Sequence, residues 1–210
     1  MPFRRTRQPY DRMDPDRELI ERCQRTKTEE YRRTFEELYN LYKDRVYNIA
    51  YRITGNAVDA LDASQETFGI IFRKIRGFRF DSRFSSWLYR IAVNAAIDLK
   101  RRGVARRIPS LETLPEGVSL EHVDLEADGA LGPERSAGGR ELEVEVQRAI
   151  DSLSPKLRGI VVLRHVEGLS YDQISEVLRC SMGTVKSRLA RAHAALEKRL
   201  IGVIDRHFVE

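Results

Sequence analysis

The sequence predicts an all-α protein made of two small helical domains joined by a flexible linker. Apolar residues recur at helical spacing through most of the chain, and hardly any segment alternates as a strand would. This pattern is lost between about residues 106 and 140, where four glycines gather between Gly129 and Gly139. We therefore expect four segments: a basic N-terminal extension (1–33), a first domain (34–105), an acidic linker (106–140) and a second domain (141–205).

The first domain is expected to contain three helices. Their ranges are residues 34–54, 57–74 and 84–102. Gly55 is a natural stop for the first helix, and Asn56 is a candidate cap for the second. Asp81 or Ser82, in the turn-like segment before the third helix, is positioned to cap it. The apolar positions expected to form the core include Phe35, Leu38, Leu41, Tyr42, Ile49, Ile53, Leu61, Phe68, Ile71 and Phe72.

The second domain is expected to contain four helices within about 60 residues. Their ranges are residues 141–153, 155–167, 171–178 and 182–200. Ser154 precedes Pro155 at a first helical position, which is a favourable helix start. Ser170 and Gln173 have the spacing of a capping box, and Ser181 can cap the last helix. Two helices joined by so short a turn predict a helix-turn-helix domain.

Positive charge is concentrated in two islands, although the net charge is only +5. Residues 72–107 hold eleven Lys or Arg against two acids, and residues 179–199 hold six against one. Residues 110–134, between the islands, carry seven acids and no Lys or Arg. Two basic islands on either side of an acidic bridge indicate two contacts with one polyanion, such as nucleic acid. Two solvated helix faces would give the same composition, so this alternative stays open.

Several classes of protein are disfavoured by composition. No run of about 18 apolar residues could span a membrane, and the basic N-terminus lacks the apolar core of a secretory signal, so we expect a cytoplasmic protein without membrane contact. Cys23 and Cys180 stand far apart without metal-ligand spacing, and no metal or other cofactor is expected. The acids near Asp59 lie on a predicted surface helix, with no second set of acids to converge on them. A nucleic-acid enzyme is therefore not expected.

The helix expected over residues 84–102 has a face suited to opened nucleic acid. With Phe84 at zero on a helical wheel, the inward positions are Leu88, Ile91, Ala95 and Leu99. One flank carries an aromatic ring, an amide and two guanidinium groups, at Trp87, Arg90, Asn94 and Arg101. Such groups can stack on bases, bond to their edges and hold phosphates. The preceding loop adds Phe78, Arg79 and Phe80 as groups that could enclose an unstacked base. The alternative is that Trp87 and the phenylalanines only complete the core.

The last helix has the pattern of one that reads duplex DNA. Val185, Leu189, Ala192 and Leu196 form an inward stripe on the wheel. The outward residues are Thr184, Lys186, Ser187, Arg188 and Arg191. Arginine can bond guanine edges with two hydrogen bonds, and Ser or Thr can bond bases or phosphates. Gly183 lets the first turn approach a groove closely. An amphipathic helix that meets only water is the alternative.

Three stretches of the chain resemble one known family. FRFDSRFSSWLYRIAVNAAIDLKRR (78–102) resembles the promoter-melting region of the extracytoplasmic-function (group four) sigma factors of the sigma-70 family. DALDASQETFGIIF (59–72) is similar to that family's polymerase-binding helix, and GLSYDQISEVLRCSMGTVKSRLARA (168–192) to its domain that reads the upstream promoter element. The stretches follow the family's order and spacing. The resemblance implies a transcription initiation factor that has no catalytic activity of its own.

The resemblance also implies roles for individual residues. The clamp helices of the largest subunit of core RNA polymerase would be bound by Asp59, Asp62, Gln65 and Glu66, although a solvated acidic face is an alternative. Melted DNA at the −10 element would be bound by Phe78, Arg79, Phe80, Asp81, Ser82, Trp87, Arg90, Asn94 and Arg101. Duplex DNA at the −35 element would be bound by Ser181, Gly183, Thr184, Lys186, Ser187, Arg188 and Arg191.

The chain departs from the family pattern at two positions. Many members have a smaller residue in place of Phe80, and Ser181 stands where proline is common. Many members are also held inactive by an anti-sigma factor, so the resemblance makes an anti-sigma factor a candidate partner of this chain. The rival is a conventional helix-turn-helix regulator that binds duplex DNA without polymerase, and it leaves the Trp87–Arg101 face unexplained.

Overall fold

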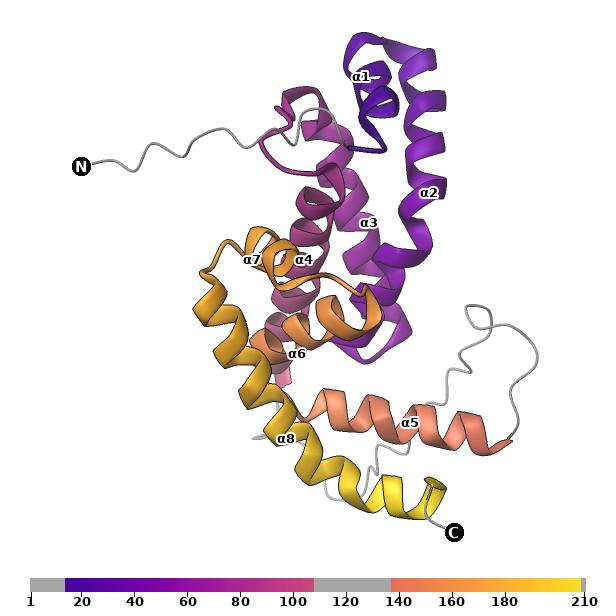
Figure 1. Cartoon of the computed structure of the whole chain (residues 1–210). Coiled ribbons are helices and arrows are strands. Elements are labelled where there is room, and N and C mark those ends of the chain that lie inside the picture. Colours follow the sequence, from indigo (N-terminus) through magenta and orange to yellow (C-terminus); the bar gives the residue numbers. More distant parts are fainter. Residues whose placement is uncertain (1–13, 108–136, 209–210) are drawn as a thin grey trace.

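The computed structural model describes residues 14–107 and 137–208, and within these ranges the chain forms helices and no strand (Figure 1). The helices are α1 (Arg17–Arg25), α2 (Thr28–Thr54), α3 (Ala57–Lys74), α4 (Phe84–Arg107), α5 (Ala137–Asp151), α6 (Pro155–Val161), α7 (Tyr171–Leu178) and α8 (Met182–Phe208). They form two groups, α1–α4 and α5–α8, so the prediction of two helical domains is confirmed. Most of the predicted linker lies outside the described residues. None of the described helices is long and apolar enough to cross a membrane.

The first group of helices begins earlier than the sequence predicted. Helix α2 starts at Thr28 rather than at residue 34, and α1 precedes it, with Ile20 and Cys23 fully buried against the core. Part of the predicted N-terminal extension therefore folds onto the first domain. Gly55 ends α2 in the left-handed conformation, with φ 82°, as its place in the sequence predicted.

The caps of α3 and α4 differ in origin. The Asn56 side chain accepts a hydrogen bond from the Asp59 amide at 2.8 Å, which confirms the predicted cap of α3. The prediction that Asp81 or Ser82 caps α4 is wrong. The amide of Phe84, the first residue of α4, instead donates at 2.7 Å to the carboxylate of Asp14, 70 residues earlier. A cap supplied by a residue 70 positions earlier cannot be read from local sequence.

The core of the first group is formed by α2, α3 and α4. Its fully buried side chains include Leu38, Ile49, Ile53, Ile71 and Leu88. Three residues predicted to be in this core are exposed instead, Leu41 by 54%, Leu61 by 52% and Phe72 by 40%.

The predicted inward face of α4 is also partly wrong. Ile91 and Leu99 are only half-buried, whereas Ala92 and Val93 are buried. The reason is that α4 is covered on a second side by α6 and α7, which belong to the other group.

Most of the residues predicted to begin or cap helices in the second group do so in the structure. Pro155 is the first residue of α6, although the Ser154 side chain makes no capping hydrogen bond. Ser170 and Gln173 form the predicted capping box of α7. Helix α6 continues into one π-helical turn, η4 (Val162–Val166), and α8 extends beyond its predicted end to Phe208.

The two groups are joined by buried polar contacts. Arg158 of α6 is 2% exposed and donates hydrogen bonds to the carbonyl oxygens of Ile53, Asp151 and Leu153. Its guanidinium also lies 2.8 Å from the Asp151 carboxylate, and burial lowers its pKa. Arg52 of α2 forms an ion pair with Glu143 of α5 at 2.7 Å. These bonds tie the end of α2 to the second group, which lies beneath it in Figure 1.

Candidate nucleic-acid interface

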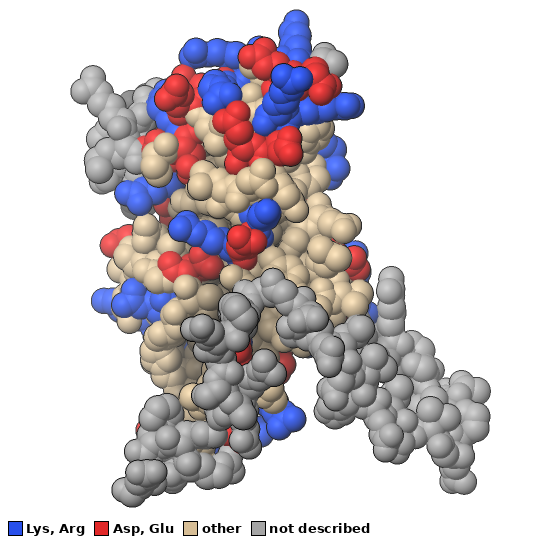
Figure 2. All heavy atoms as spheres, turned by 90° about the vertical axis from the view of Figure 1, so that its right-hand side faces the viewer, with Lys and Arg blue, Asp and Glu red and all other residues tan. Residues whose placement is uncertain are grey.

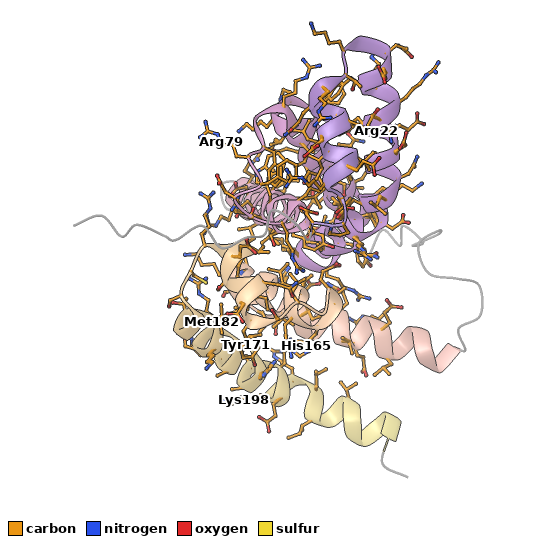
Figure 3. All side chains as sticks on the ribbon, turned by 45° about the horizontal axis from the view of Figure 1, so that its top comes forward. Arg22, Arg79, His165, Tyr171, Met182 and Lys198 are labelled. Carbon is orange, nitrogen blue, oxygen red and sulfur yellow. The ribbon has the colours of Figure 1, made fainter. Side chains whose placement is uncertain are left out.

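The loop between η2 (Ile75–Gly77) and α4 is built around aromatic rings. Phe78 stacks on Trp87 with ring centroids 5.0 Å apart, and it meets Phe80 edge-on at 5.0 Å. Trp87 also contacts the buried ring of Phe84 at 5.8 Å. Trp87 is half-buried, so it both contributes to the core and keeps part of its ring at the surface. Figure 3 shows Arg79 projecting from this loop away from the helices.

Phe80 has an unusual backbone conformation at the tip of this loop. Its φ of 55° lies in the left-handed region, which bulky residues rarely adopt. The Arg17 guanidinium of α1 lies over its ring, 4.6 Å from the centroid. The neighbouring Asp81 is exposed and Ser82 half-buried. Aromatic and cation–π contacts thus hold the tip of the loop in place.

A cleft between the two groups gathers charged and amide side chains from both. Asn94, Asp98 and Arg101 of α4 line it together with Lys156 of α6 and Arg188 of α8. Asn94 and Arg101, predicted to bind opened DNA, therefore share one cleft with Arg188, which is predicted to bind duplex DNA. With three basic groups against one acid, the cleft suits a polyanion.

Arg90 lies farther along the boundary between the groups. It is half-buried, and burial, followed by the charge of Arg179, lowers its pKa, while Glu176 acts in the opposite direction. The neighbouring Ser86 donates a hydrogen bond to Glu176 of α7 at 3.1 Å. Arg90 therefore lies against α7 and the turn that follows it in this arrangement.

Helices α7 and α8 form the predicted helix-turn-helix. The turn is possible because Arg179 adopts the left-handed conformation, with φ 48°. Ser181 then accepts a hydrogen bond from the Thr184 amide at 3.1 Å and caps α8, as predicted. Val185 and Ala192 are fully buried. The start of α8 is therefore fixed against the body of the second group.

The other face of α8 presents short polar and basic side chains. Gly183, Lys186, Ser187 and Arg191 are exposed, and Thr184 and Arg188 are half-buried. The Arg191 guanidinium donates to the Ser187 carbonyl oxygen at 3.3 Å. The arrangement places basic and hydroxyl groups within the first three turns of the helix, where base and phosphate contacts are made in this motif.

A stripe of acidic and amide groups lies on α3. Asp62, Gln65 and Glu66 are exposed, and Asp59 is half-buried beside its cap residue. Glu66 lies 3.7 Å from Arg102 of α4. The apolar part of this surface was not predicted from the sequence, because the helical spacing of Leu61 placed it in the core. Leu61, 52% exposed, thus lies at the surface on the same helix as these acids.

The far end of the first group has a different surface. Figure 2 shows Lys and Arg mixed with Asp and Glu at the upper end, over α1 and the start of α2. The ion pairs there include Arg22–Glu37 at 3.0 Å and Arg25–Glu21 at 2.9 Å. Charges of both signs pair at this end, so it does not form a basic patch.

Helix α1 and the residue Asp14 before it contact this loop, which was not predicted from the sequence. Asp14 and Gln24 bond to backbone groups near the two ends of the loop, and Arg17 covers Phe80. The helical spacing of Leu19, Ile20 and Cys23 was the signal that could have revealed α1.

Burial raises the pKa of the Cys23 thiol to about 11. Across the described ranges, no three His, Cys, Asp or Glu side chains gather as metal ligands.

Two family models match the chain. Residues 38–107 match sigma-70 region 2, and residues 143–196 match sigma-70 region 4. The chain is 37% identical over 188 residues to the RNA polymerase sigma-H factor of Pseudomonas aeruginosa, covering 89% of this chain and 94% of that protein. It is 36% identical over 196 residues to the ECF RNA polymerase sigma-E factor of Escherichia coli K12, covering 91% and 97%. The ECF RNA polymerase sigma factor SigW of Bacillus subtilis is 36% identical over 167 residues, covering 79% and 88%.

Two solved structures share the fold. One is the sigma factor RpoE in complex with the anti-sigma factor NepR from Bartonella quintana, with a TM-score of 0.59 and 23% identity over 80% of this chain and 96% of that one. The other is CnrH in complex with the cytosolic domain of CnrY, with a TM-score of 0.63 and 23% identity over 90% and 99%.

Proposed function

This chain belongs to the sigma-70 family, as a member of its extracytoplasmic-function group. On this basis we propose which of its surfaces bind the polymerase and which bind the promoter during transcription initiation. It binds core RNA polymerase, recognises the −35 and −10 promoter elements and promotes opening of the DNA, without catalysing a reaction itself. It acts in the cytoplasm. The observation that carries the proposal is the Phe78–Trp87 stack, with the exposed Asn94 about two turns farther along α4, in one chain with the α7–α8 helix-turn-helix.

Residues 78–82, which we name the capture loop, take a flipped base of the −10 element together with Asn94. Removing a base from the stack costs a few kcal/mol, so a shaped pocket has to offset it. The aromatic rings of the loop provide stacking surfaces, and the Asn94 amide can both donate to and accept from a base edge. Arg79, Arg90 and Arg101 hold the neighbouring phosphates.

The exposed face of α8 reads the −35 element in the major groove. Arg188 and Arg191 contact base edges or phosphates, with Thr184, Lys186 and Ser187 beside them, and Ser181 and Gly183 set the start of the helix. A conventional regulator would use the same face. It would have no use for the aromatic loop, whose geometry favours the sigma-factor function.

The stripe on α3 docks on the clamp helices of the polymerase's largest subunit. Asp59, Asp62, Gln65 and Glu66 supply the polar contacts, and the exposed Leu61 adds an apolar one. An anti-sigma factor is a candidate partner as well, since the related fold of RpoE was solved in complex with one.

A pull-down of purified core RNA polymerase tests the proposal. The wild-type chain is expected to retain the polymerase, and the Asp62→Arg, Glu66→Arg double variant is expected to lose it, because two acidic contacts become repulsive. The matched control is Glu29→Arg, Glu30→Arg, which makes the same charge change at the exposed start of α2. Wild-type protein that binds duplex DNA tightly and no polymerase would make it a conventional regulator.

A further inference from the structure

Three side chains near the start of the described chain contact the capture loop or the backbone that flanks it. The carboxylate of Asp14, only 8% exposed, accepts from the Phe84 amide at 2.7 Å and from the Asp16 amide at 3.1 Å. The Phe84 amide is at the start of α4, where backbone donors have no partner within the helix. Asp14 therefore satisfies this donor and fixes the point where the loop joins α4.

The beginning of the loop is held by Gln24 of α1. Its side-chain amide donates to the carbonyl oxygen of Phe78 at 2.8 Å and to that of Ile75 at 3.1 Å. Both acceptors are backbone groups, so the contact sets the path of the main chain whatever side chains the loop carries. Gln24 is half-buried, which protects these bonds from competition by water.

The tip of the loop is held by Arg17. Its guanidinium lies over the ring of Phe80, 4.6 Å from the centroid, while Phe78 packs on the same ring edge-on. Phe80 needs such support, because a left-handed φ of 55° is unfavourable for a bulky residue. Asp14, Gln24 and Arg17 thus hold the end, the start and the tip of one loop.

From these contacts we infer that α1, with Asp14 just before it, is a positioning element for reading the −10 element. A free loop would lose backbone entropy on closing around a flipped base, and a loop already held in place avoids this loss. Because Arg17 covers the Phe80 ring, it also influences which base the capture loop accepts. The inference rests on the proposed function, in which the capture loop takes the flipped base.

The test compares Arg17→Ala and Gln24→Ala with Arg22→Ala in the full-length protein assembled with core polymerase. Arg22 is a matched control, since it lies on the same helix and pairs with Glu37 instead of touching the loop. Binding is measured on a fork DNA with an opened −10 strand, carrying either the preferred or a substituted base at the flipped position. Both loop-side variants are expected to bind the preferred fork about tenfold more weakly and to discriminate less between the bases. Arg22→Ala and binding to −35 duplex should not change.

A second readout separates loop positioning from general stability. Trp87 is the single tryptophan of the chain and stacks on Phe78, so its fluorescence reports on the loop without any DNA. Arg17→Ala is expected to increase quenching of Trp87 by acrylamide about twofold, and Arg17→Lys, which keeps a cation over the ring, should restore most of the protection.

The outcomes distinguish the inference from the proposed function. If Asn94→Ala abolishes base discrimination while Arg17→Ala and Gln24→Ala retain it at the wild-type level, α1 is not a positioning element and the inference is wrong. If Asn94→Ala and Phe78→Ala also leave discrimination unchanged, the assignment of the capture loop itself is wrong, and the inference is overturned with it.

Discussion

The imidazole rings of His165 and His193 meet at the surface of the second group of helices, with their Nε2 atoms 2.9 Å apart. Figure 3 shows His165 close to α8. Partial burial, followed by the neighbouring His193 and Arg164, lowers the pKa of His165 below its ordinary value of 6.5. The folded protein therefore binds fewer protons at this residue than the unfolded chain does between that lowered pKa and 6.5.

This difference predicts a loss of stability in mild acid. Because the unfolded chain takes up more protons in that window, the free energy of unfolding falls as the pH is lowered from 7.5 through 6.5. His165→Gln should show a shallower fall over the same range, since the titrating group is gone. Thermal unfolding at a series of pH values measures both slopes. Equal slopes in the two proteins would mean that His165 does not contribute to the acid sensitivity.

At the scale of a single helix, two serines in the second group offer a direct comparison. Ser170 accepts a hydrogen bond from the Gln173 amide at 3.2 Å as part of a capping box, whereas Ser154 precedes α6 without a side-chain cap. Both have the sequence signature of a helix start. The difference is one of geometry, and it should appear as a difference in stability.

Ser170→Ala is expected to lower the free energy of unfolding by about 1 kcal/mol, because it leaves an amide at the start of α7 without its partner. Ser154→Ala is the control and should change it by less than about 0.5 kcal/mol. Urea denaturation of the three proteins measures the change. Equal losses in both variants would contradict the capping role.

The same comparison explains how much of the fold and site the sequence could predict. Signals that act within a few residues, such as the Gly55 stop and the Asn56 cap, were predicted and confirmed. Signals that depend on distant partners were not: the cap on α4 comes from Asp14, and Leu61 is exposed although its spacing fits a buried stripe. The candidate site divides in the same way, since the faces of α4 and α8 follow from helical spacing and the contacts of α1 do not.

At the scale of the whole molecule, the contact between the two groups depends on a small residue. Gly159 of α6 is buried, and a Cβ atom there would lie 3.2 Å from Val93 of α4 and 3.7 Å from Ile97. Even a Cβ atom at this position would require Val93 to shift, and a long side chain would require much more space. The cleft shared by Asn94 and Arg188 lies along this contact, since Gly159 is also part of its lining.

Gly159→Leu is therefore expected to force the two groups apart while each keeps its helices. Small-angle scattering should show a larger radius of gyration than for the wild type, with an unchanged helical signal in circular dichroism. Gly202→Leu on α8 is the matched control, because a Cβ atom there meets nothing within 4 Å. An unchanged radius for Gly159→Leu would show that the packing of α6 on α4 does not hold the groups together.

The buried guanidinium of Arg158 has a consequence for biosynthesis. The carbonyl oxygen of Ile53, near the end of α2, accepts its hydrogen bond from a residue 105 positions later in the chain. At about 5–20 residues per second, the ribosome adds that arginine roughly 5 to 20 seconds after the isoleucine. During this interval the carbonyl oxygen of Ile53 has to accept its hydrogen bond from water instead. The nascent first domain therefore completes its hydrogen bonding only after α6 has been synthesised, so the second half of the protein finishes the folding of the first.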